Sequence, residues 1–251
     1  MNTMKELEFT MNFQEMRLLF LHRSNYRSRL TKRIRKLFKR LRLKNFFDHY
    51  AGNVVELYDY LFCRNSIWRA HKTEMMGVLD TMKTSLPTQS RSILDIGSGF
   101  GAIDLLLFHH YEGAPNIHLL DKDDIAPHKS SGFHDSAESF APYNSFAYTR
   151  SFLERNGVPG DKIATTDIAT ETFPQEEQFD LVLSLLAWGF HFPVSTYIDD
   201  VYNTLSPGGT LIMDVRKTTH GIDELEQKFG HRPTVIYEEE KFSRVSVQKN
   251  G

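Results

Sequence analysis

The stretch Asp95-Ile-Gly-Ser-Gly-Phe-Gly101 holds the residues best suited to chemistry. Three glycines at alternate positions allow a tight turn and let a ligand approach the backbone closely. A dinucleotide site needs G-x-G-x-x-G, whereas here the third glycine follows the second by two positions. Asp95 stands two residues before the first glycine, where a carboxylate repels a pyrophosphate and attracts a cation. The loop therefore predicts a site for a positively charged ligand.

Two further acidic residues end segments that are typical of strands. Asp121 comes 20 residues after Gly101, at a place where a carboxylate can take both hydroxyls of a ribose. Asp167 lies in Ala164-Thr-Thr-Asp-Ile168 and can accept a hydrogen bond from an exocyclic amine. Acids after three successive strands, around a turn without Lys or Arg, predict a pocket for a cationic nucleoside. S-adenosylmethionine, which joins a sulfonium and an ammonium to adenosine, is such a ligand.

These segments, with Phe179-Asp-Leu-Val-Leu-Ser184 and Leu205-Ser-Pro-Gly-Gly-Thr-Leu211, resemble the ordered motifs of class I S-adenosylmethionine-dependent methyltransferases. The resemblance covers about residues 91–215, roughly half of the chain. It implies a seven-stranded sheet with one antiparallel strand near the C-terminus, and S-adenosylmethionine as cofactor. The cofactor-binding residues that it implies are Gly97, Ser98 and Gly99 at the methionine part, Asp121 at the ribose, and Asp167 and Ile168 at the adenine. Asp95, Gly101, Lys122 and Ser184 are further candidate cofactor-binding residues, and Lys122 stands where many members of the family have an apolar residue.

Methyl transfer from a sulfonium needs an aligned nucleophile and, for a hydroxyl, a base that takes its proton. His191 follows the fourth expected strand and is the first candidate base, because an unperturbed imidazole has a pKa of about 6.5. In the alternative interpretation it only packs or caps the next helix. Its neighbours Trp188, Phe190 and Phe192 are expected to wall the pocket and to place aromatic faces near the cation.

The long connection between Asp123 and Asn144 supplies two more candidates. His134 is an alternative base, and Tyr143 is a possible hydrogen-bonding partner of the acceptor. A connection of this length is unusual without structure of its own, so it is either a lid or a surface insertion. Its sequence contains Gly-Phe-His followed by Pro-Tyr-Asn-Ser, which is faintly similar to small-molecule and sugar O-methyltransferases. No set of Asp and His has the spacing of a divalent-metal site, so we predict no metal and a metal-independent reaction.

Strands and helices that position these residues alternate along the second part of the chain. Strands are expected at residues 92–96, 116–121, 163–168, 179–186 and 210–215, with a closing pair at 233–237 and 242–247. Helices are expected between them at residues 102–110, 145–156, 196–205 and 223–229. Such alternation means parallel pairing with both faces covered, so we predict an α/β, Rossmann-like, doubly wound sheet.

A boundary is expected in Thr84-Ser-Leu-Pro-Thr-Gln-Ser90, because Ser, Thr and Pro cluster there between two patterned regions. Residues 1–85 then form a helical N-terminal cap, and residues 86–251 form the S-adenosylmethionine-binding domain. Within the cap, further helical turns are expected at residues 12–21, 54–62 and 68–83.

The cap contains a strongly basic block. From His22 to Phe47 there are eleven Lys or Arg and no Asp or Glu. Leu30, Ile34, Leu37 and Leu41 recur at three- and four-residue spacing, which predicts an amphipathic helix. Three interpretations stay open for residues 22–44: a helix packed on the domain with solvated cations, a membrane-surface helix that meets anionic lipid, or a nucleic-acid contact.

Composition excludes several classes of protein. The net charge of −2 conceals two regions of opposite charge. The basic block holds eleven of the 30 basic side chains, so the rest of the chain has 19 basic side chains and all 32 acidic ones. One cysteine excludes an internal disulfide and a multi-cysteine metal site, and it favours a reducing compartment. The first ten residues lack the apolar region of a secretory signal, and no apolar run is long enough to span a bilayer. We expect a cytoplasmic protein, with the inner membrane surface as an alternative place.

The predicted function is O-methylation of a hydroxyl on a small molecule or glycoconjugate. The alternative within enzymes is an RNA methyltransferase positioned by the basic helix. A non-catalytic methyltransferase-like binding protein is the alternative outside enzymes, and the intact G-x-G-x-G, Asp121 and Asp167 argue against it.

Overall fold

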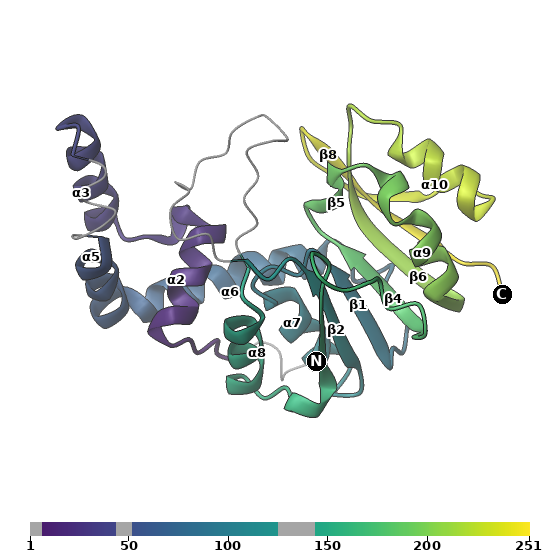
Figure 1. Cartoon of the computed structure of the whole chain (residues 1–251), viewed down its shortest axis with the longest axis horizontal. Coiled ribbons are helices and arrows are strands. Elements are labelled where there is room, and N and C mark those ends of the chain that lie inside the picture. The colour runs from purple at the N-terminus through teal and green to yellow at the C-terminus, as the bar shows by residue number, and fades with distance from the viewer. Residues whose placement is uncertain (1–6, 44–51, 125–143) are drawn as a thin grey trace.

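A mixed sheet of seven strands forms the centre of the computed structural model, which describes residues 7–43, 52–124 and 144–251 (Figure 1). Its strands are β1 (Ser92–Ile96), β2 (Asn116–Asp121), β3 (Ile163–Asp167), β4 (Phe179–Ser184), β6 (Leu205–Arg216), β7 (Thr234–Glu238) and β8 (Phe242–Gln248). Their order is β3-β2-β1-β4-β6-β8-β7. The first five in this order pair in parallel, and β8 is antiparallel to both of its neighbours. The fold is Rossmann-like, and the seven-stranded sheet implied by the motifs is confirmed.

Helices cover both faces of the sheet because its central strands are apolar on both sides. In β4, Leu181 and Leu183 join the core that α6 (Arg64–Asp80), α7 (Ala102–His110) and α8 (Phe146–Arg155) share, whereas Val182 joins the opposite core. The opposite core lies against α9 (Ile198–Thr204) and α10 (Gly221–Phe229). Side chains alternate between the faces of a strand, so a continuous apolar run fits a strand that is buried twice.

The N-terminal helices are α2 (Phe13–His22), α3 (Arg29–Arg40), α5 (Gly52–Tyr58) and the π-helix η3 (Asp59–Cys63), which runs on into α6. Of these, α2 joins the first core, and η3 packs against it. The Asn12 side chain accepts the N–H of Glu15, and the Glu15 carboxylate accepts the N–H of Asn12 in return, which starts α2 as a capping box. The same buried carboxylate accepts hydrogen bonds from Ser151 and Arg155 of α8. It therefore ties α2 to the sheet domain, and the division at residue 85 stays a prediction.

The main departure from the expected elements follows β4. Residues Ala187–Phe192 form a strand, β5, beside β6, where a pocket-lining loop was expected. Trp188 is 1% exposed, and its indole N–H donates to the carbonyl of Val194 at 2.9 Å. The expectation that Trp188 walls the pocket is therefore wrong, because its side chain is packed into the core that α9 and α10 cover. No helix among the described residues is long and apolar enough to cross a membrane.

Candidate cofactor-binding and catalytic site

The glycine loop lies at the carboxyl end of β1 in a conformation that requires its glycines. Gly97, Gly99 and Gly101 all have left-handed backbone angles, with φ of +79°, +52° and +74°. A Cβ on Gly97 would lie 2.2 Å from the Cβ of Ala187, and one on Gly101 would lie 2.9 Å from Cγ2 of Thr149. The loop is thus packed from two sides, and larger residues fit neither its angles nor its space.

The end of β2 holds this loop in place. The N–H of Gly99 donates to Oδ2 of Asp121 at 2.8 Å, and the N–H of Gly97 donates to the carbonyl of Leu120 at 2.7 Å. The N–H of Lys122 donates to Oδ1 of Asp121 at 2.7 Å. Burial raises the pKa of Asp121, while the hydrogen bonds from Gly99 and Lys122 act to lower it. Each oxygen of the Asp121 carboxylate keeps a further lone pair, so it can still accept hydrogen bonds from the two hydroxyls of a ribose, as predicted.

A second buried acid faces the one that precedes the loop. Asp95 on β1 is 3% exposed, and Asp104 in the first turn of α7 is fully buried. Among the described residues, Oδ1 of Asp95 and both oxygens of Asp104 have no basic side chain as a partner, and the two carboxyl groups interact with each other. Burial raises the pKa of Asp104 to about 7, and burial together with Asp104 and Asp121 raises that of Asp95 well above its usual range. A cation beside this pair would favour both ionised forms.

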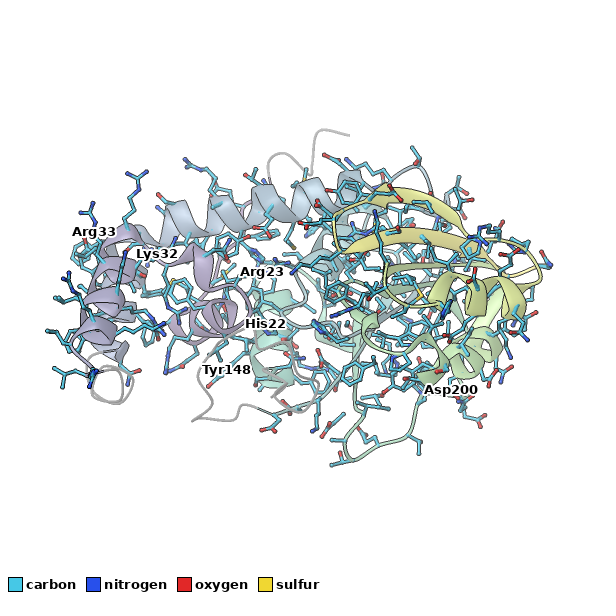
Figure 2. The ribbon with its side chains drawn as sticks, turned by 90° about the horizontal axis from the view of Figure 1, so that it is seen from above. His22, Arg23, Lys32, Arg33, Tyr148 and Asp200 are labelled. Carbon is cyan, nitrogen blue, oxygen red and sulfur yellow. The ribbon has the colours of Figure 1, made fainter. Side chains whose placement is uncertain are left out.

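An imidazole from the N-terminal cap, that of His22, lies beside Gly99 of the glycine loop. A Cβ on Gly99 would lie 3.3 Å from Cε1 and 3.5 Å from Nδ1 of His22, the last residue of α2. Nε2 of His22 is buried without a partner in the described part of the chain. Burial, followed by the charge of Arg23, lowers the pKa of His22 to about 4. The ring is therefore neutral at pH 7. Figure 2 shows His22 and Arg23 where the N-terminal helices meet the sheet domain.

A polar cluster behind His22 fixes the cap around the loop. Arg23 forms an ion pair with Glu74 of α6 at 3.3 Å, and the Tyr26 hydroxyl donates to the same carboxylate. Nδ1 of His71 lies 3.3 Å from that hydroxyl, and its ring packs 5.8 Å from the ring of Phe100 in the glycine loop. Burial lowers the pKa of His71 to about 3. Both imidazoles beside the loop are thus uncharged at neutral pH.

Residues predicted near the adenine lie at the ends of paired strands. Asp167 stands opposite Asp121 in the register of β3 and β2, and the N–H of Ile168 donates to the carbonyl of Asp121 at 3.0 Å. The Asp167 carboxylate accepts from the Ala169 N–H at 3.0 Å and from the Thr170 hydroxyl at 3.0 Å. The hydrogen bond from Ala169 is the main cause of its lowered pKa. Asp167 therefore caps a turn, and its contact with adenine stays a prediction.

Ser184 and Lys122 have different surroundings. Ser184 is fully buried, where its hydroxyl donates to the carbonyl of Ile96 at 2.9 Å and accepts from the N–H of Trp188 at 3.0 Å. It thereby joins the ends of β4 and β1 to the start of β5. Lys122 is exposed beside Asp121. Cofactor contact by either residue stays a prediction.

His191 lies on β5, away from the glycine loop. Four residues along a strand separate it by about 13 Å from Ala187, the residue that packs against Gly97. Burial and the nearby charge of Arg216 lower its pKa, while Arg216 itself lies over the ring of Phe190 at 4.5 Å. A catalytic role for His191 stays a prediction. His134 and Tyr143 lie outside the described residues, and within those residues no three His, Cys, Asp or Glu are grouped to hold a metal.

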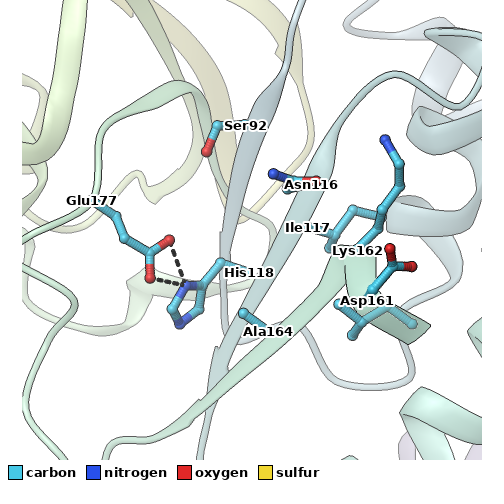
Figure 3. Close-up of a pocket in the computed structure, with 9 residues that line it drawn as sticks. Ser92, Asn116, Ile117, His118, Asp161, Lys162, Ala164 and Glu177 are labelled. Carbon is cyan, nitrogen blue, oxygen red and sulfur yellow. Dashed lines mark hydrogen bonds and ion pairs between the residues drawn. The ribbon is translucent and has the colours of Figure 1, made fainter. Parts of the chain in front are cut away.

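A separate pocket lies at the opposite edge of the sheet, between the first residues of β1, β2 and β3 (Figure 3). His118 borders it, with Nε2 2.7 Å from Oγ1 of Thr166 and Nδ1 3.1 Å from the Glu177 carboxylate. Open α/β sheets bind their ligands at the carboxyl ends of the strands. The glycine-loop edge is therefore the better candidate site, although sequence reasoning missed His22 and Asp104 there.

Solved structures of similar shape include several methyltransferases. They include the 16S rRNA N2 G1207 methyltransferase RsmC of T. thermophilus, solved with AdoMet and guanosine (16% identity, TM-score 0.48, 70% of this chain and 43% of that chain). Others are a methyltransferase from Pyrococcus furiosus (15%, 0.48, 70% and 83%) and StiE O-MT residues 961–1257 (14%, 0.48, 74% and 76%). The chain thus spans less than half of the first.

No protein-family model and no curated protein matches the sequence. At these identities and TM-scores, the structural likeness carries no argument about cofactor or acceptor. The case for both rests on the residues around the glycine loop.

Proposed function

We propose that the chain is an S-adenosylmethionine-dependent methyltransferase whose acceptor is a hydroxyl of a small molecule or glycoconjugate. The observation that carries the proposal is the buried acidic pair Asp95 and Asp104 beside a left-handed glycine loop, two carboxyl groups that interact with each other and have no cation beside them among the described residues. Unpaired buried carboxylates are costly, and a bound sulfonium and ammonium would compensate them. A pyrophosphate at the same loop would meet like charge.

The polar groups around the loop also match the rest of this cofactor. Oγ of Ser98 is buried without a partner in the described residues, and the Asn144 side chain lies beside the Asp121 carboxylate. Ser98 and Asn144 can donate to a carboxylate, and Asp95 can accept from an ammonium. Gly97, Ser98 and Gly99 would then hold the methionine part, and Asp121 would hold the ribose. The fit therefore involves hydrogen-bond donors as well as acids.

When bound, S-adenosylmethionine supplies a methyl group already activated by its sulfonium. The chain must align the acceptor, exclude water and hold its proton. His22 is a neutral imidazole beside the glycine loop. Its Nε2 could accept a hydrogen bond from the acceptor hydroxyl and take the proton as the oxygen–methyl bond forms and the sulfur–methyl bond breaks. Its low pKa makes it a weak base in the resting state, so alignment is its larger contribution.

Incubation with cofactor labelled in its methyl group tests this proposal. Label from the wild type should enter hydroxyl-bearing metabolites as an ether, and an Asp121→Asn variant should transfer little of it. Label found only in RNA would overturn the hydroxyl acceptor in favour of the RNA alternative. Binding of the cofactor without transfer to any fraction would favour the non-catalytic alternative.

His22→Asn and His191→Asn form a matched pair for the acceptor side. We expect His22→Asn to lower kcat about 100-fold, with cofactor affinity little changed, and His191→Asn to keep most of the turnover. Because the pKa of His22 is about 4, its protonation should not reduce the wild-type rate between pH 8 and about pH 5.5. The reverse order of the two variants would assign the base to His191.

A further inference from the structure

We infer that α3 docks the protein on an anionic lipid surface. The inference is independent of the methyl transfer proposed above. It rests on the side chains of α3, on their charge, and on the place of this helix at one end of the molecule.

A stripe of leucines on α3 is open to solvent. Leu30, Leu37 and Leu41 are 44%, 52% and 57% exposed, and Leu43 just beyond the helix is 47% exposed. At 3.6 residues per turn, Leu30, Ile34, Leu37 and Leu41 fall within an arc of about 60°. Apolar side chains gathered in one exposed stripe indicate an interaction surface, whereas single ones do not.

Cations cover the other faces of the same helix. Between Arg29 and Leu43 there are eight Lys or Arg and no Asp or Glu. Arg29, Arg33, Lys36 and Lys39 are exposed, and the described part of the chain gives them no ion pair. A leucine stripe flanked by lysine and arginine is the arrangement of a helix that lies in the plane of a membrane surface. Anionic headgroups would meet the cations while the leucines enter the apolar boundary.

A second copy of the chain and a nucleic acid both fit this surface less well than anionic lipid does. Two copies of the chain would bring eight cations against eight cations, which is repulsive at contact distance. A nucleic acid would satisfy the cations, but it offers little to a stripe of leucines. An anionic lipid surface matches both the charge and the apolar stripe.

The position of α3 suits docking on a flat surface. In both views the helix lies at the end of the molecule away from the sheet, and Figure 2 labels Lys32 and Arg33 at this end. Its start is anchored, since the Thr31 hydroxyl donates to Asp59 of η3 at 2.8 Å and the N–H of Ser28 donates to the same carboxylate at 3.2 Å. Exposed Leu61 and Phe62 of η3 extend the apolar surface at this end.

Vesicle flotation with the full chain tests the inference. The wild type should float with vesicles containing phosphatidylglycerol and not with pure phosphatidylcholine. In a Leu37→Glu, Leu41→Glu double variant, the fraction of protein that floats with the vesicles should fall about tenfold or more. Val235→Glu is the matched control, because Val235 is 46% exposed on β7 at the other end of the chain and should float like the wild type. Circular dichroism establishes that each variant is folded.

A second pair of measurements separates the occupants. Lys36→Gln with Arg40→Gln should reduce flotation at low salt, because each removed cation weakens the attraction to anionic lipid. Wild type that fails to float with anionic vesicles overturns the inference. A dimer in sedimentation velocity that the leucine double variant dissociates would overturn it in favour of a second copy. RNA binding that survives in the leucine double variant, without flotation, would overturn it in favour of nucleic acid.

Discussion

The carboxyl edge of the sheet and the outer end of the cap use charge in opposite ways. At the carboxyl ends of the strands a few acids are buried, and Asp95 and Asp104 lie against each other without a cation beside them in the described residues. At the end, many cations of α3 are exposed to water. A buried charge interacts strongly with one neighbouring group, whereas exposed charges are screened by solvent and interact weakly, so that many must act together. The carboxyl ends of the strands are therefore suited to one defined ligand, and the outer end of the cap is suited to an extended surface.

This difference predicts how each region responds to substitution. A single change at the edge disturbs backbone geometry and burial together, so its effect should be large. A single change on α3 removes one of many equivalent side chains, so its effect should be small unless several are changed.

Gly97→Ala should have the largest effect on stability. The new Cβ would lie 2.2 Å from that of Ala187, at a φ of +79°. Left-handed strain of about 1–2 kcal/mol adds to overpacking of about 1–3 kcal/mol, so the free energy of unfolding should fall by about 2–5 kcal/mol. Gly208→Ala is the control, because Gly208 has a φ of +76° with nothing within 4 Å and should lose only the strain. Equal losses in chemical denaturation would contradict the packing of the loop.

Asp104→Asn should stabilise the protein above pH 7 by about 2 kcal/mol. The folded pKa of Asp104 is about 7 and its ordinary value is 3.8, so between these values the folded state binds more protons than the unfolded state. Wild-type stability from this group is therefore present below about pH 4 and is lost as pH rises through 7. Asp161→Asn, an exposed control, should change little. Denaturation at pH 5 and pH 8 measures both, and an unchanged pH slope in Asp104→Asn would contradict the prediction.

Salt should weaken vesicle binding through α3 more than it weakens cofactor binding at the glycine loop, where we expect the smallest effect. Raising sodium chloride from about 50 to 300 mM shortens the Debye length, so flotation with anionic vesicles should fall about tenfold. Cofactor affinity at the buried acids should change less than about threefold over the same range. Similar salt slopes in flotation and in cofactor titration would show that the two regions do not differ as described.

Local patterns predicted most of the fold. Apolar runs and glycine or proline stops placed β1, α7, β2 and β8 within a residue or two of their observed bounds. The strand β5 was missed because Ala187–Phe192 is short, aromatic and interrupted by Gly189, and its burial does not alternate along the strand. Trp188 and Phe192 share one face of β5, yet Trp188 is 1% exposed and Phe192, at the end of the strand, is 56% exposed.

The site was less accessible to sequence reasoning. His22 lies far from the glycine loop along the chain, and only tertiary packing of α2 against the domain brings them together. Asp104 did leave a local signal, since it is the one charged residue in the apolar run Ala102–Phe108. A carboxylate within a helix that is otherwise apolar is expected to be buried, and a buried acid beside a ligand loop is a functional candidate.

Calorimetric titration with S-adenosylmethionine tests the central claim, that the glycine-loop edge binds a cationic nucleoside. The wild type should bind with a dissociation constant in the micromolar range, and Asp121→Asn, which keeps the size of the side chain, should bind at least about tenfold more weakly. Folded wild-type protein that gives no binding heat up to about 1 mM cofactor, or an Asp121→Asn variant with wild-type affinity, would contradict the account.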